Sequence, residues 1–240
     1  MNVPLLQPRK LLADNAVVFT FLLLSVVAIP LSGYSLGSIV QEMIVRLGRN
    51  SFLVLALLIP IFSGMGLNFG MVLGAMAGQV GLIFAVDLNV QGVQGLAFAA
   101  LLGLPLSVLL GWMTGWVMNK AKGREMVTGY ILAFFMSGVY QFFVLYLMGS
   151  VIPIQSQNIL LSRGYGIRNT LDLDKTGLRM ALDKALELQI GGFTLPLANF
   201  LVILVFSLVI IWFKKTKLGQ DMRAVGSDMH VAAAAGIPVE

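Results

Sequence analysis

The chain consists of long apolar stretches separated by short polar or glycine-rich segments. Six stretches are long enough to cross a hydrocarbon core about 30 Å thick, which takes about 20 helical residues. They cover residues 15–33, 51–66, 67–85, 95–118, 126–148 and 193–213. A backbone in lipid must satisfy its own hydrogen bonds, so each stretch is predicted to be a helix. The pattern therefore predicts an all-α, polytopic transmembrane bundle of about six spans.

Two features of these stretches affect how they are divided into spans. The second and third stretches are almost continuous, and Pro60 with the glycine-rich run 63–70 is expected to break them apart. The first stretch follows Arg9 and Lys10, as a signal peptide would. Pro30 and Leu31 occupy the places where a small-x-small cleavage site would stand, so we expect the first stretch to remain as a span.

Small residues recur at four-residue spacing in two of the predicted spans, which places them on one helix face. Such faces let helix backbones approach closely, and close approach drives association where lipid removes the hydrophobic advantage. The packing residues are Gly66, Gly70, Gly74 and Gly78 in the third span, and Gly103, Ser107, Gly111 and Gly115 in the fourth. The pattern fits tight packing alone, and it also fits faces that slide during transport.

Residues 149–192 form the one sizeable polar segment between spans. An amphipathic helix of about three turns is predicted within it, from apolar positions that share one face. These positions are Leu178, Ala181, Leu182, Ala185, Leu186 and Leu188. The helix could lie on the membrane surface or cap the bundle. It could also form a docking surface for an external protein.

Composition supports a membrane protein and narrows its partners. The chain is 58% hydrophobic and 11% charged, with a mean hydropathy of +0.90, whereas soluble domains carry about 25% charged residues. The net charge is +5, but the basic residues stand at the ends of the spans, so topology explains them without nucleic acid as a partner. Cysteine is absent, which excludes disulfides and thiolate metal sites.

The orientation follows from the distribution of Lys and Arg around the spans. With the N-terminus inside, the inner segments hold nine basic residues and the outer segments hold seven, five of them in the long 149–192 loop where the rule is weak. The nine are Arg9, Lys10, Lys120, Lys122, Arg124, Lys214, Lys215, Lys217 and Arg223. We therefore predict an N-terminus inside a cytoplasmic-type membrane.

Candidate chemistry is sparse. The predicted spans hold few ionisable residues, which argues against a proton-driven carrier with buried relay groups. A substrate path is instead predicted to include Asn68, Phe69, Gln79 and Thr128. The chain has no Gly-Lys dipeptide and so no phosphate-binding loop, and His230 is its only histidine. We expect no bond chemistry, no bound metal or cofactor, and energy supplied by another subunit.

The segment after residue 213 carries the most specific pattern. A basic exit from the membrane is followed by a glycine, two short helix-prone pieces around Gly226, and an alanine run that ends at Gly236 and Pro238. Small residues of this kind permit close docking against another protein. The sequence thus divides into a transmembrane domain, residues 1–213, and a cytoplasmic loop, residues 214–240.

The segment reads Thr-x-Leu-Gly-x-x-x-Arg-Ala-Val-Gly from Thr216 to Gly226, and the alanine-rich stretch and Gly236-Ile237 follow it. This pattern resembles the coupling loop of bacterial binding-protein-dependent ABC permeases. The subfamily it resembles imports ribose and other sugars, nucleosides or branched-chain amino acids. The resemblance implies ATPase subunits that hold the ATP, a second permease subunit and an external solute-binding protein as partners. It assigns the ATPase contact to Leu218, Gly219, Met222, Arg223, Ala224, Gly226, Ala233 and Gly236.

Two departures from this family pattern are informative. The turn from Gly64 to Gly70 has Gly66 where sugar permeases tend to have an acid, so it is closer to the nucleoside and amino acid branches. Permeases of the family usually continue for several spans after the coupling loop, so the chain looks like the N-terminal part of a longer permease or one half of a split one. The alternative functions are a self-contained secondary carrier or channel, whose broken spans would form the site, and a structural scaffold.

Overall fold

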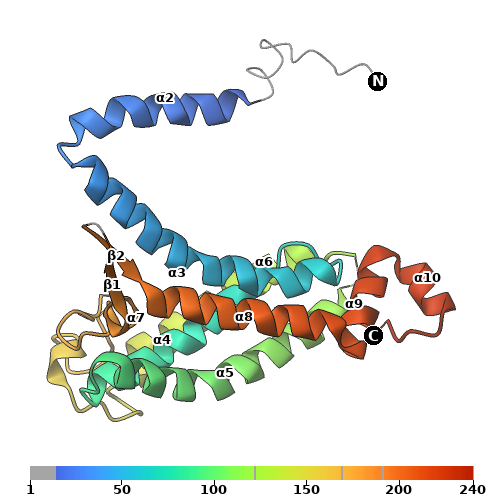
Figure 1. Ribbon diagram of the computed structural model, residues 1–240. Helices are drawn as coiled ribbons and strands as arrows, with labels where there is room; N and C mark the ends of the chain where they lie inside the picture. Colours follow the sequence, from blue (N-terminus) through green and yellow to red (C-terminus); the bar gives the residue numbers. More distant parts are fainter. Residues whose placement is uncertain (1–14, 122, 169, 191, 240) are drawn as a thin grey trace, which may run out of the picture.

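The computed structural model describes residues 15–121, 123–168, 170–190 and 192–239, and in this part of the chain the structure is a bundle of helices (Figure 1). Arg9, Lys10 and Lys122 of the predicted inner segments lie outside the described residues. The elements are α2 (Ala16–Leu31), α3 (Leu36–Phe62), α4 (Met71–Asp87), α5 (Gly92–Lys120), α6 (Glu125–Phe142), the π-helical turn η1 (Phe143–Leu147), the short helix η2 (Gln157–Ile159), α7 (Ala181–Ala185), the strands β1 (Glu187–Ile190) and β2 (Phe193–Pro196), α8 (Leu197–Lys215), α9 (Lys217–Ser227) and α10 (Met229–Ala234).

Four of the described helices are long and apolar enough to cross a membrane: α3, α5, α6 continued through η1, and α8. Helices α2 and α4 are also apolar but have 16 and 17 residues. Five helices, α3 to α6 and α8, lie alongside one another, whereas α2 lies apart from them (Figure 1). The predicted all-α polytopic bundle is confirmed.

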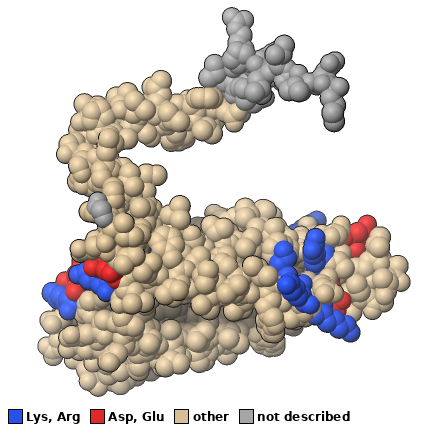
Figure 2. Space-filling view, in the orientation of Figure 1, with Lys and Arg blue, Asp and Glu red and all other residues tan. Residues whose placement is uncertain are grey.

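The bundle has two distinct ends. The α9 end holds the α3–α4 break (residues 63–70), the turn before α6, and α9 with α10, while the hairpin end holds the loop from residue 148 to strand β2 (Figure 1). On the visible face, charged side chains gather near the two ends, and the stretch between them shows none (Figure 2). This separation is what a membrane-spanning bundle requires, because charged groups are costly within hydrocarbon.

The predicted break between the second and third spans is confirmed. Helix α3 ends at Phe62, two residues after Pro60, and α4 begins at Met71. Gly64 has a φ of +78°, a left-handed conformation that glycine adopts without steric cost. Asn68 then accepts a hydrogen bond from the backbone N–H of Gly70 through its Oδ1, at 2.8 Å, which orders the last turn before α4.

The predicted start of the second span, residue 51, is wrong, because α3 begins fifteen residues earlier at Leu36. Ser35 caps the helix by accepting a hydrogen bond from the Ser38 N–H at 3.1 Å. Glu42 and Arg46 form an ion pair one turn apart, at 2.8 Å. A search for continuous apolar runs misses this half of α3, because its polar side chains interrupt the run without interrupting the helix.

Two predictions for the loop of residues 149–192, which we term the outer loop, and for the span after it are also wrong. The three-turn amphipathic helix is reduced to the five residues of α7, and the first four residues of the predicted sixth span form strand β2. Strands β1 and β2 pair antiparallel, with Leu188 opposite Leu195. Gly192, with a φ of +88°, permits the tight turn between them. The hairpin therefore draws Leu188 out of the predicted helix, and only Leu178 and Ala181 of its apolar face are buried.

Helices α4 and α5 form the tightest helix pair. A Cβ on Gly103 would lie 3.2 Å from the carbonyl oxygen of Ala77 and 3.3 Å from the Cα of Gly78. A Cβ on Gly81 would clash with the carbonyl group of Ala99, whose carbon would be 3.0 Å away. Gly81 lies outside the predicted stripe, since its spacing from Gly78 is three residues. Gly74, Gly111 and Gly115 face open space within the described chain.

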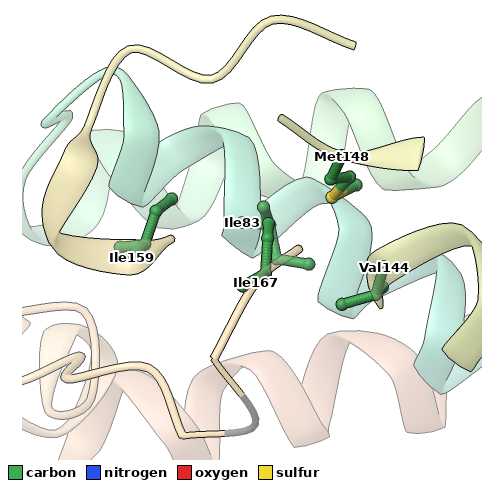
Figure 3. Packing of buried hydrophobic residues seen from close by; sticks show 5 residues of the cluster. All are labelled: Ile83, Val144, Met148, Ile159 and Ile167. Atoms are coloured by element: carbon green, nitrogen blue, oxygen red, sulfur yellow. The ribbon is translucent and has the colours of Figure 1, made fainter. Parts of the chain in front are cut away.

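The hairpin-end loop packs onto the bundle through an apolar cluster (Figure 3). Ile83 of α4, Val144 of η1, Met148 and the loop residues Ile159 and Ile167 are all at most 8% exposed. The Ile167 N–H donates to the carbonyl of Val144 at 3.0 Å, so the loop is also held by the backbone. This part of the loop thus forms a lid over the ends of α4 and α6.

Polar contacts join the same end to α3 and α8. Asp183 of α7 accepts hydrogen bonds from the side chain of Arg49 in α3 and from Nδ2 of Asn199 in α8, the latter at 2.5 Å. Asn199 is 1% exposed. Gln41 forms two hydrogen bonds with the backbone of Thr194 in β2. The polar half of α3 is therefore fixed by the outer loop rather than by lipid.

Replacing Gly81 by alanine is expected to lower the free energy of unfolding by about 1–3 kcal/mol, because the added methyl group forces α4 from α5. Gly74→Ala, on the same helix, is the matched control: its methyl group enters open space, and stability is expected to be retained or raised. Thermal unfolding in detergent, followed by circular dichroism, checks both variants. Equal midpoints for the two would show that α4 and α5 do not pack through Gly81.

Asp183→Ala is expected to cost about 1–3 kcal/mol of stability, because the amide of buried Asn199 loses its hydrogen-bond acceptor. Asp172→Ala is the control, since Asp172 makes a 3.5 Å surface pair with Lys175 and such pairs contribute about 1 kcal/mol or less. Thermal unfolding measures both variants. A loss no larger for Asp183→Ala than for Asp172→Ala contradicts the structural role of this contact.

Candidate functional site

A tight turn holds the α9–α10 segment against the end of α8. Thr216 donates a hydrogen bond to the carbonyl of Phe213 at 2.6 Å and accepts one from the Gly219 N–H at 3.2 Å, which caps α9. A Cβ on Gly219 would clash with the backbone of Phe213, so only glycine permits this turn. Asp228 caps α10 by accepting from the N–H groups of His230 and Val231, at 2.9 and 3.1 Å.

Gly226 lies inside this arrangement, against the α3–α4 break. A Cβ on Gly226 would lie 2.7 Å from the Gly64 nitrogen and would also clash with the carbonyl oxygen of Phe62. The contact is between backbones, with no side chain between them. The resemblance assigns Gly226 to the contact with a partner subunit. In the structure, Gly226 instead packs against the chain's own α3–α4 break.

The other residues of the predicted coupling set divide into two groups. Gly219 is buried and Met222 and Ala224 are half-buried, whereas Leu218, Arg223, Ala233 and Gly236 are exposed. The sequence analysis missed two exposed apolar residues of α10, Val231 (65% exposed) and Met229 (39% exposed). Leu218 (60% exposed) and these two residues are the exposed large apolar side chains of α9 and α10, and we term this set the apolar α9–α10 surface. Both α10 residues are visible in the sequence as apolar positions within a polar segment.

A cavity of about 420 Å³ lies beside the contact between Gly226 and the α3–α4 break, and it is lined by the break, α9, the start of α10 and the neighbouring ends of α5 and α6. Four methionines line it: Met65, Met118, Met222 and Met229. Methionine side chains are flexible and adapt to changes in the shape of a cavity. The space around the α9 contact is therefore one that can be repacked.

Three of the four predicted path residues belong to the α9 end. The ring of Phe69 packs edge-on against Tyr130 of α6, with centroids 5.7 Å apart. A Cβ on Gly129 would lie 3.7 Å from the nitrogens of Phe69 and Gly70, which brings its half-buried neighbour Thr128 close to the break. Asn68 holds the break through its bond to Gly70. Asn68, Phe69 and Thr128 thus lie in one region.

Gln79 lies elsewhere. It is eleven residues from Asn68 in sequence, and eight residues of helix α4 rise about 12 Å. It lines a second cavity, of about 430 Å³, between α4, α6 and the outer loop, together with Gln141 of α6 and Arg168 of the loop. The Arg168 Nε–H donates to the carbonyl of Leu160 at 3.0 Å. We term this the outer cavity, and its lining brings together polar groups from three segments.

Both glutamines are exposed in the single chain although they belong to apolar helices. Polar side chains in membrane spans face a protein neighbour or a water-filled space, because hydrocarbon offers them no hydrogen-bond partner. Gln141 is not part of the path predicted from the sequence. The outer cavity could bind a polar solute by hydrogen bonds, and its lining contains no Asp or Glu among the described residues.

Comparison with known proteins agrees with this arrangement. No curated protein and no solved structure matches the chain. Residues 66–240 match the family described as the permease component of the branched-chain amino acid transport system. This match covers most of the chain, including the α3–α4 break from Gly66, the outer cavity and the α9–α10 segment. The chain therefore belongs to this family of transport permeases, and it is a multi-pass membrane protein.

Proposed function

We propose that the chain is the membrane-spanning subunit of an ATP-driven importer, and that the apolar α9–α10 surface is where an ATPase subunit binds. The observation that carries the proposal is this surface itself. Leu218, Met229 and Val231 are exposed at an end of the bundle that also carries Lys214 and Lys215. Exposed apolar groups rimmed by polar ones are typical of protein interfaces. Membership in a permease family supports the same conclusion.

The ATP is held by partner subunits, and this chain carries out no bond chemistry. The sequence has no phosphate-binding loop. Basic residues flank the α9 end, which supports a cytoplasmic location for α9 and α10 and an N-terminus on the same side of a bacterial cytoplasmic membrane. The hairpin end then faces outward, where an external binding protein delivers the solute.

The solute path lies between this chain and a second permease subunit. Support comes from the exposed Gln79 and Gln141, which need a polar or protein neighbour within the membrane. The outer cavity, with hydrogen-bonding groups and a volume of about 430 Å³, is large enough for a small polar molecule. We infer a nucleoside, a sugar or a branched-chain amino acid as the solute.

The docking proposal is tested by Val231→Asp in the tagged full chain, expressed in its host and purified from membranes. ATP hydrolysis recovered with the chain is expected to fall at least about tenfold, because a carboxylate buried in an apolar interface costs about 2 kcal/mol or more. Ser227→Ala, on the same segment, is the control and is expected to retain hydrolysis. Recovery of wild-type hydrolysis with Val231→Asp contradicts docking on this surface.

The path proposal is tested by uptake of radiolabelled leucine, ribose and uridine. For the solute that the wild-type chain imports, Gln79→Leu with Gln141→Leu is expected to reduce uptake roughly tenfold, since each lost hydrogen bond costs about 0.5–1.5 kcal/mol. Ser137→Ala is the control, because that hydroxyl is already bonded within α6 to the Ala133 carbonyl at 2.9 Å. Unchanged uptake in the double variant argues against this path. Uptake by the chain alone in liposomes without ATP favours a secondary carrier.

A further inference from the structure

The contact between α9 and the α3–α4 break consists of backbone on backbone. A Cβ on Gly64 would lie 2.8 Å from the Cα of Gly226, and a Cβ on Gly226 would lie 2.7 Å from the Gly64 nitrogen and the Ser63 carbonyl carbon. Side chains absorb small displacements by changing rotamer, but two backbones in contact do not have this freedom. A movement of α9 at Gly226 would therefore press directly on the backbone of the α3–α4 break.

The break in turn is held firmly to the rest of the bundle. Asn68 fixes Gly70 by the 2.8 Å hydrogen bond. A Cβ on Gly70 would lie 2.6 Å from Cγ2 of Thr114 in α5, so this position too has no spare room. Helix α4, which carries Gln79 into the outer cavity, starts at the next residue. A displaced break thus acts directly on the first turn of α4.

Helix α9 is arranged so that its far end can move. Its first turn is fixed to α8 by the Thr216 cap and by Gly219 against Phe213. Toward Gly226 it borders the methionine-lined cavity of about 420 Å³. Because its first turn is fixed and its other end borders a space that can be repacked, α9 can tilt about a point near Thr216.

We propose that Gly226 and Gly64 are positioning residues for transport: through their contact, movement of α9 shifts the α3–α4 break and with it α4. The proposal rests on the proposed importer function and deepens it. It gives Gly226 a role distinct from that of the apolar α9–α10 surface. The surface binds the partner, whereas Gly226 acts on the chain's own backbone and passes the movement into the membrane.

Gly226→Ala separates these roles. Its methyl group cannot fit against the break, so the contact is altered while Leu218, Met229 and Val231 keep their side chains. The tagged chain is purified from host membranes, ATP hydrolysis recovered with it is measured, and uptake is measured with whichever of leucine, ribose or uridine the wild type imports. Hydrolysis is expected to stay within about twofold of wild type, while uptake falls at least about tenfold. The neighbouring Ser227→Ala is expected to retain both activities.

The outcomes distinguish this proposal from the importer function. Loss of recovered hydrolysis in Gly226→Ala would make Gly226 a partner contact and overturn the proposal. Wild-type uptake in Gly226→Ala would overturn it as well, while leaving the importer function intact. A wild-type chain that recovers no ATP hydrolysis and imports none of the three solutes would instead contradict the importer function.

A second measurement does not depend on the folding of Gly226→Ala. Met65→Cys in the break and Val225→Cys on α9 place thiols in the lining of the methionine-lined cavity, and the native chain has no cysteine that could interfere. A reducible bifunctional thiol reagent then fixes α9 to the break. Because the proposal has α9 and the break move together, uptake is expected to persist on cross-linking, as in each single-cysteine variant. Uptake that stops on cross-linking and returns on reduction would show that α9 must move relative to the break, and would overturn the proposal.

Discussion

The architecture depends on how closely helix backbones approach one another. Lipid removes the hydrophobic advantage of burying one apolar helix against another, so packing and hydrogen bonds must hold the bundle together. Gly81 and Gly103 let α4 and α5 approach to the point where a methyl group has no room. The same rule holds outside the span region, where Gly226 contacts Gly64. Small residues therefore organise both the bundle and the junction between α9 and the α3–α4 break.

Different kinds of interaction stabilise the two ends of the bundle. At the hairpin end, an apolar cluster around Met148 and polar bonds around Asp183 attach the loop to α3, α4 and α8. At the α9 end, backbone contacts and caps leave a cavity lined by flexible methionines. One end is thus fixed by specific side-chain bonds, and the other has a defined contact beside repackable space. The proposed function uses this division, with movement received at the α9 end and solute at the hairpin end.

The polar groups follow the same division. Asn68, Phe69 and Thr128 lie near the break, while Gln79 and Gln141 line the outer cavity. Helix α4 links the two regions, since it starts at the break and carries Gln79. Movement of one helix can therefore alter both regions together. The exposed glutamines are polar groups on apolar helices, and within a membrane they require a polar neighbour or water.

The sequence by itself determined the fold class, the positions of most spans and the break at residues 63–70, because long apolar runs and Pro-Gly interruptions act locally. Family membership was readable from the residues after Thr216 for the same reason. Tertiary structure decided the early start of α3, the β1–β2 hairpin and the position of Gly226. Each depends on partners far along the chain: Gln41 on Thr194, Leu188 on Leu195, and Gly226 on Gly64. Periodicity and spacing carry no information about which distant segment a residue meets, so these contacts were visible only in three dimensions.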